Sequence, residues 1–202
     1  MSIERTGLFK VGGKDATILG DDIKVGQKAP EFTAHAPDWS SVKGLADTRG
    51  KVRIIAALPS LDTEVCDRET RRFNQEAAAL GSDITIFVLS TDLPYAQKRW
   101  CGAAGVDQVK TLSDHMAAEF GEKYGTLIKE RRTLRRAVFV VDRNDNVTYA
   151  AYMPAPGDEP DYEEVLTAAK AELAWDLRAA TARSIFARSK ICLPLSAKPY
   201  RL

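Results

Sequence analysis

The sequence predicts an α/β domain in which helices flank a mixed central sheet. Two observations lead to this fold class. Short continuous apolar runs, which fit strands buried on both faces, alternate with longer segments of helical periodicity. Near the C-terminal end, two apolar runs flank the turn-forming tetrapeptide RNDN, and a further helical segment follows. The alternation gives parallel strands, and the late hairpin adds antiparallel ones.

The first predicted elements are a β-hairpin, a loop-rich region and a strand. Two short apolar runs flank a Gly-Gly pair within residues 8–20, which indicates a hairpin. Residues 26–50 are rich in Gly, Pro, Ser and Asp and are expected to be mostly loop, with one short strand at residues 31–36. The continuous apolar run KVRIIAAL at residues 51–58 then predicts a buried strand.

Helices and strands alternate from there. Good helix formers with apolar residues at helical spacing predict a helix over residues 63–80, and ITIFVL predicts a second buried strand at 84–89. A short helix is expected at residues 93–101, ended by Gly102, and a short strand at 109–112.

The remaining elements complete and cover the sheet. A helix is expected over residues 113–123, a hairpin over 137–141 and 147–153, and a last helix from about Asp161 past Ala171. This order of elements is typical of a thioredoxin-like fold with insertions.

A change in composition divides the chain into two parts. Residues 1–171 form the predicted domain, whereas residues 172–202 hold six Lys or Arg against two Asp or Glu. Apolar residues in the first half of this basic extension predict that the last helix continues to about Ala187. We expect the extension to be structured only if it packs on the domain or on a partner.

Composition excludes several classes of function. The 29 basic and 28 acidic residues leave no electrostatic signature of a nucleic-acid or anionic-membrane partner. The sequence has no apolar run of the roughly 18–20 residues that span a bilayer, and its first residues lack the apolar core of a signal peptide. Three cysteines and two histidines give neither a disulfide framework nor metal-ligand spacing. We therefore expect a cytoplasmic protein without a metal or other cofactor.

The most informative segment is PSLDTEVC at residues 59–66, where a buried strand ends and a helix begins. Cys66 falls in the first turn of that helix, where free backbone N–H groups and the helix dipole favour the thiolate. Thr63 lies three residues earlier, so its hydroxyl can lie on the same side as the sulfur, and Pro59 can shield the thiol from water. The alternative is that Cys66 is a small buried hydrophobe, but the P-x-x-x-T-x-x-C spacing favours a nucleophile.

The other two cysteines lie further along the chain. Cys101 lies late in the next helix, at the edge of its apolar face, and is either a half-buried filler or a resolving thiol for Cys66. As a resolving thiol it would close a loop of about 35 residues, worth roughly 4 kcal/mol in the chain-entropy model. If the reduced helices hold the two sulfurs apart, local unfolding has to precede the bond. Cys192 lies in the extension and is interpreted as incidental.

Four arginines precede the strand at residues 137–141. Arg136 adjoins this buried strand, where a guanidinium is costly without an acceptor, and a thiolate or a developing oxyanion would supply one. Arg135 points to the opposite face and is expected to be exposed to solvent. His115 is interpreted as a surface residue near a helix start, and His35 has no evident partner.

Four segments together resemble a known family. PSLDTEVCDRETRRFNQEAAAL, STDLPYAQKRWCGAAGV, RRAVFVVDRNDNVTYA and EPDYEEVL resemble, in order, the thiol peroxidase branch of the peroxiredoxins, of the atypical two-cysteine kind. The resemblance covers roughly residues 8–171, and the extension has no counterpart in it.

The resemblance implies a thioredoxin fold and the reduction of hydrogen peroxide and of organic hydroperoxides. It implies Cys66 as the peroxidatic cysteine, Cys101 as the resolving cysteine of an intramolecular disulfide, and Pro59, Thr63 and Arg136 as the remaining active-site residues. Recycling by thioredoxin and assembly into a homodimer are implied as well.

Three other functions compete with a peroxidase. A dithiol oxidoreductase of the thioredoxin kind needs a C-x-x-C pair, and Cys66 is followed by Asp-Arg-Glu. A non-catalytic redox sensor would use the same two cysteines, so the sequence leaves it open. An interaction module that acts through the extension would lose its function if the residues after Leu173 were removed.

Overall fold

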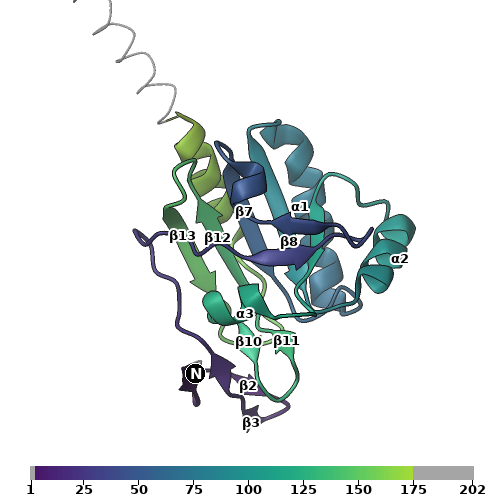
Figure 1. The fold of residues 1–202 in the computed structure, drawn as a ribbon, viewed down its shortest axis with the longest axis vertical. Coiled ribbons are helices and arrows are strands. Elements are labelled where there is room, and N and C mark those ends of the chain that lie inside the picture. The colour runs from purple at the N-terminus through teal and green to yellow at the C-terminus, as the bar shows by residue number, and fades with distance from the viewer. Residues whose placement is uncertain (1–2, 175–202) are drawn as a thin grey trace, which may run out of the picture.

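The computed structural model describes residues 3–174. At its centre is a seven-stranded mixed sheet with the strand order β13-β12-β7-β8-β9-β5-β6 (Figure 1). Strands β7, β8 and β9 are parallel, and the strands on either side are antiparallel to their neighbours. The seven strands are β5 (Thr33–His35), β6 (Ser41–Lys43), β7 (Val52–Ala57), β8 (Ile84–Ser90), β9 (Lys110–Ser113), β12 (Ala137–Val141) and β13 (Val147–Tyr152).

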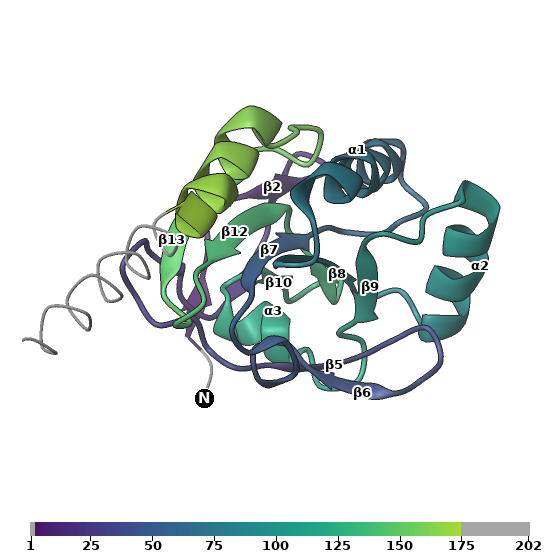
Figure 2. The same ribbon diagram turned by 90° about the horizontal axis from the view of Figure 1, so that it is seen from above.

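Helices cover both faces of this sheet, which confirms the predicted fold class (Figure 2). Helix α1 and the helix over residues 162–174 lie on one face, α3 lies on the other, and α2 contacts β9. The labelled helices are α1 (Glu64–Leu80), α2 (Pro94–Ala104), α3 (Glu119–Lys123) and the 3₁₀ helix η1 (Ala46–Thr48). Within residues 3–174, no helix is long and apolar enough to cross a bilayer.

The alternation of side chains along each strand builds two hydrophobic cores. Ile54 and Val138 point to the α1 face and pack with Phe73 of α1. Their neighbours Ile55 and Phe139 point to the opposite face and pack with the aromatic side chains of α3 and the loops around it. Because the strands are buried on both faces, they appear in the sequence as continuous apolar runs.

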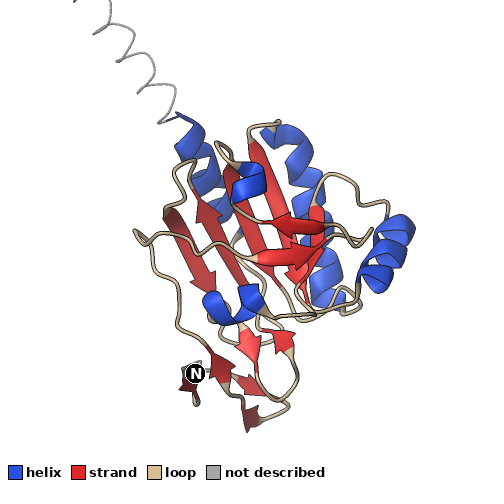
Figure 3. Cartoon of the chain, in the orientation of Figure 1, coloured by secondary structure: helices blue, strands red, loops and turns tan. Residues whose placement is uncertain are grey.

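The N-terminal segment pairs with the middle of the chain, at the lower end of the molecule in Figure 3. The predicted hairpin within residues 8–20 consists of β2 (Lys10–Val11) and β3 (Lys14–Asp15). The following strand leaves the hairpin and joins a separate four-stranded sheet with the order β1-β4-β10-β11. The members of this sheet are β1 (Glu4–Arg5), β4 (Ile18–Leu19), β10 (Leu127–Ile128) and β11 (Thr133–Leu134).

Two predicted helix boundaries are wrong. Helix α2 continues past Gly102 to Ala104. Its C-cap is Gly105, whose left-handed backbone lets its N–H donate to the carbonyl of Cys101. Helix α3 begins at Glu119 and not at residue 113, because Ala118 takes a left-handed conformation before it. The carboxylate of Asp114 accepts hydrogen bonds from the backbone N–H groups of residues 120 and 121 in this short helix.

The basic extension lies outside the described residues apart from residues 172–174, which continue the last helix. Three predictions about the extension therefore fall outside the described residues: the end of the last helix near Ala187, the irregular C-terminal end and the incidental role of Cys192.

Candidate active site

The turn from β7 into α1 positions Cys66. Strand β7 ends at Ala57, Pro59 lies half-buried in the bend that follows, and α1 begins at Glu64. Cys66 is therefore in the first turn of α1, and its side chain is fully buried against the sheet. Its sulfur lies where unpaired backbone N–H groups of a helix start favour negative charge.

Thr63 supplies the first hydrogen bond to this sulfur. It occupies the N-cap position of α1 in an extended conformation, yet its hydroxyl makes no capping bond to the helix backbone. The hydroxyl instead lies 2.7 Å from Cys66 Sγ and 3.1 Å from the carbonyl of Ser60. Thr63 itself is exposed, whereas the sulfur that its hydroxyl contacts is buried.

Arg136 supplies the second hydrogen bond, and strand pairing brings it there. Ala137 of β12 pairs with Ala57 of β7 in an antiparallel register, so the residue before Ala137 lies where β7 ends and α1 begins. The side chain of Arg136 points to the α1 face, and its Nη2 donates to Cys66 Sγ at 3.2 Å. Burial alone would lower the pKa of Arg136, but the neighbouring Glu69 and Cys66 raise this pKa above its ordinary value.

Glu69 is a member of this cluster that the sequence analysis missed. It is completely buried, and its Oε2 accepts a hydrogen bond from Nη1 of Arg136. Burial raises the pKa of Glu69 to about 7, although the neighbouring guanidinium opposes that shift. The signal was present in the sequence: positions 66, 69, 70 and 73 follow the helical i, i+3, i+4, i+7 pattern, so Glu69 shares the buried face with Cys66 and Phe73.

This arrangement can do nucleophilic chemistry. A sulfur at a helix start accepts hydrogen bonds from a hydroxyl and from a guanidinium, both of which stabilise negative charge on it. The same donors can hold a second atom that gains negative charge during an attack by the sulfur. Across residues 3–174, no cluster of three or more His, Cys, Asp or Glu side chains could hold a metal ion.

Cys101 lies in α2 and contacts a different partner. Its sulfur is half-buried and lies 3.4 Å from the hydroxyl of Thr111 in β9. Burial raises the pKa of this thiol. Cys66 and Cys101 are both free thiols, and each sulfur lies beside a different hydroxyl. A bond between the two sulfurs therefore requires each to leave its present partner.

Arg135 contradicts the sequence prediction of a solvent-exposed side chain. It does point away from Arg136, but it is only 4% exposed. Its guanidinium pairs with Asp22, donates to the carbonyl of Gly125 and lies 4.1 Å over the ring of Tyr152. Burial lowers its pKa. The N-terminal segment covers this face of the sheet, and the local sequence around Arg135 carries no sign of that cover.

The two histidines lie together. Their rings are 6.0 Å apart, and Nδ1 of His115 lies 2.9 Å from the hydroxyl of Ser113. Burial and the neighbouring His35 lower the pKa of His115.

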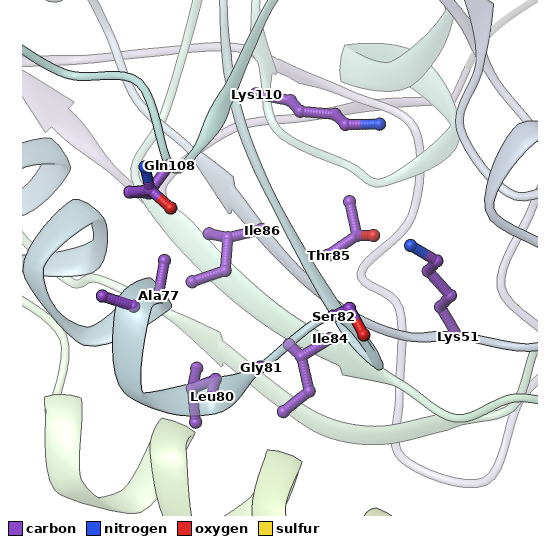
Figure 4. A pocket seen from close by; sticks show the side chains of 11 residues that line it. Lys51, Ala77, Leu80, Gly81, Ser82, Ile84, Thr85, Ile86, Gln108 and Lys110 are labelled. Carbon is purple, nitrogen blue, oxygen red and sulfur yellow. The ribbon is translucent and has the colours of Figure 1, made fainter.

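A cavity of about 410 Å³ lies at the end of the sheet where β8 begins (Figure 4). Side chains that include Lys51, Thr85 and Lys110 line it, and it contains none of the site residues predicted from the sequence. The cluster around Cys66 is thus separate from this cavity.

Comparison with known proteins gives the family. A family model described as Redoxin matches residues 24–166, which is most of the chain. The chain belongs to the redoxin family. A relative from Halalkalibacterium halodurans, named thiol peroxidase, is 53% identical over 161 residues, which cover 80% of this chain and 96% of the relative. The thiol peroxidase of Bacillus subtilis is 52% identical over 159 residues, which cover 79% of this chain and 94% of the relative.

Solved structures agree with the redoxin assignment. A peroxiredoxin-like protein from Aquifex aeolicus is 35% identical, with a TM-score of 0.75 over 85% of this chain and 98% of that one. A thiol peroxidase from Chromobacterium violaceum, 18% identical, shares the fold with a TM-score of 0.70 over 79% of this chain and 93% of that one. The resemblance to the thiol peroxidase branch of the peroxiredoxins is therefore confirmed.

Proposed function

We propose that this chain is a thiol peroxidase that reduces hydrogen peroxide and organic hydroperoxides at Cys66. One observation carries the assignment to that residue: the buried sulfur at the start of α1 accepts hydrogen bonds from both Thr63 and Arg136. The names of the relatives, which are about 50% identical, support the same activity and do not favour a non-catalytic sensor.

In the first step, the Cys66 thiolate attacks one oxygen of the peroxide. The O–O bond breaks, and its electron pair leaves with the second oxygen, which takes a proton from solvent and departs as water or an alcohol. The sulfur loses two electrons and becomes a sulfenic acid. Arg136 and the Thr63 hydroxyl hold the peroxide and stabilise the departing oxygen, while Pro59 limits access of water to the bend.

In the second step, Cys101 acts as the resolving thiol. Its sulfur attacks the Cys66 sulfenic acid, water leaves, and an intramolecular disulfide forms. A dithiol reductant then returns two electrons by exchange, and we propose thioredoxin for this role. A cytoplasmic location fits the cycle, because that compartment keeps thiols reduced.

A homodimer is the proposed assembly. The large side chains of Trp39, Leu93, Tyr95 and Met116 are exposed, and the rings of Trp39 and Tyr95 lie 5.1 Å apart. An apolar aromatic patch of this kind is common at protein interfaces. Sedimentation of the wild-type chain and of Tyr95→Glu tests the assembly: the variant should sediment as a monomer, and an unchanged dimer would exclude this patch.

The activity is tested by peroxide consumption in the presence of thioredoxin, thioredoxin reductase and NADPH. Cys66→Ser should abolish turnover, whereas Cys101→Ser should allow one oxidation per subunit and then stop. Cys192→Ser is the matched control and should turn over at the wild-type rate. Normal steady-state turnover by Cys101→Ser would exclude the resolving role of Cys101.

A further inference from the structure

The structure contains a cavity beside Cys101 that arises from the way β5 meets β9. Strand β9 pairs with β8 along four residues, but it pairs with β5 only between Ser113 and His35. In an antiparallel register, the ladder would next place Ala36 opposite Leu112 and Pro37 opposite Thr111. The ladder stops there because the chain turns from β5 into β6: the N–H of Ala36 donates to the carbonyl of Ser40. Pro37 has no N–H to donate, so the two strands diverge.

The space between the diverging strands is a cavity of about 370 Å³, a size typical of small-molecule sites. Cys101 lies on its wall with Thr111, its hydrogen-bond partner. The lining is mostly apolar and consists of Ala36, Pro37, Val42, Cys101, Val106, Val109, Lys110, Thr111 and Leu112. None of Cys66, Thr63, Arg136 and Pro59 lines it, so it is distinct from the site of peroxide attack.

Lys110 is the charged residue of this lining. It is exposed, and none of the carboxylates described in residues 3–174 forms an ion pair with it. Its flexible stem also lines the cavity of Figure 4, so the ammonium is free to turn toward either opening. An apolar cavity with a single unpaired cation at its edge complements a ligand with an alkyl body and one carboxylate.

We propose that this cavity binds a medium-chain fatty carboxylate, and that the bound ligand holds Cys101 in α2 and slows disulfide formation. The alkyl chain fills the space between β5, β9 and α2, and the carboxylate pairs with Lys110. The second half of the proposal rests on the proposed function, because it concerns the resolving step.

The coupling follows from how weakly α2 is anchored. Only Pro94 and Gln97 of its eleven residues are buried, whereas α1 buries five residues that include Cys66 and Phe73. Cys101 has to leave Thr111 before it can reach Cys66, and this movement opens the cavity wall. A ligand that binds only the intact cavity stabilises the state before the movement, so the rate falls by the factor 1 + [L]/Kd.

Binding is measured by equilibrium dialysis of sodium decanoate against the reduced full-length chain. Lys110→Gln should weaken binding about fivefold, the effect of losing one exposed ion pair. Lys51→Gln is the matched control, because Lys51 lines only the other cavity, and it should bind decanoate normally. Ala36→Phe should fill the cavity and abolish binding.

Coupling is measured in a single turnover with one equivalent of peroxide. At decanoate ten times above its Kd, the Cys66–Cys101 bond should form about tenfold more slowly, while consumption of the peroxide is unchanged. Excess peroxide should then convert more Cys66 to sulfinic acid, because the sulfenic acid persists longer.

Several results would overturn the proposal. These are decanoate binding that survives both Lys110→Gln and Ala36→Phe, equal binding of decanol, or bound decanoate with an unchanged rate of disulfide formation. If no Cys66–Cys101 bond forms without ligand, the proposed function fails instead, and dialysis still decides whether the cavity binds the carboxylate.

Discussion

Arg136 joins two side chains of α1 through one guanidinium: Nη2 lies 3.2 Å from Cys66 Sγ, and Nη1 binds the carboxylate of Glu69. The same cation therefore contacts the Cys66 sulfur and a buried acid one helical turn away. Because an unpaired buried carboxylate is costly, Glu69 fixes the guanidinium in the orientation that reaches the sulfur. This relationship leads to the first two predictions.

Replacing Arg136 with Lys should slow oxidation of Cys66 by about 100-fold or more. A lysine ammonium can pair with Glu69, but it lacks the planar fork that reaches the sulfur at the same time. Loss of one donor that stabilises developing charge typically costs a rate factor of about 10²–10³. Stopped-flow measurement with the reduced protein gives the rate, and the thermal midpoint shows whether the variant is folded. A rate within threefold of the wild type would contradict this role.

Glu69→Gln should remove a pH dependence of stability. The folded pKa of about 7 lies above the ordinary value of 4.5, so between these pH values the folded protein holds a proton that the unfolded chain has released. The free energy of unfolding therefore falls as pH rises through this window, by at most about 3 kcal/mol. Urea unfolding is measured at pH 5 and pH 8 for both proteins. The free energy of unfolding of Glu69→Gln, relative to that of the wild type, should be higher at pH 8 than at pH 5. A constant difference between the two proteins would mean that Glu69 does not titrate there.

Thr63→Val should lower the rate of Cys66 oxidation by roughly tenfold to 100-fold, and Thr63→Ser should retain most of it. Valine keeps the shape of threonine but removes the hydroxyl that lies 2.7 Å from the sulfur. Because this hydroxyl does not cap α1, the thermal midpoint should change little. Equal rates for the Val and Ser variants would show that the hydroxyl takes no part.

Arg135→Met should destabilise the fold by about 2 kcal/mol without changing the rate at Cys66. The substitution removes the ion pair with Asp22 and the contact with the ring of Tyr152, both on the face opposite to α1. Urea unfolding and the single-turnover rate separate the two effects. A slower reaction in a fully folded variant would place Arg135 in the active site.

Much of the fold is predictable because its signals are local. Strands β7, β8 and β12 are buried on both faces and appear as continuous apolar runs. The proximity of Thr63 to Cys66 follows from a spacing of three residues at a helix start. The direction of Arg136 follows from alternation along the strand that it precedes. The catalytic roles of these residues remain predictions.

The features that were not predicted from the sequence depend on contacts between distant segments or on the choice between similar signals. The burial of Arg135 depends on Asp22, which lies more than 100 residues earlier in the chain. Gly102 and Gly105 both resemble a helix stop, and only the latter takes the left-handed backbone. The burial of Glu69 beside a cation is predictable from the sequence, because a charged residue on the buried face of a helix requires a buried partner. Arg136 is that partner.

We propose that Cys66 and Cys101 form the two-cysteine cycle of this peroxidase. The most direct test mixes the reduced full-length protein with one equivalent of cumene hydroperoxide and maps the cysteine bonds by mass spectrometry of digests. We expect a fast intramolecular bond between Cys66 and Cys101, with Cys192 still free. A bond to Cys192, or no oxidation of Cys66 at all, would contradict it.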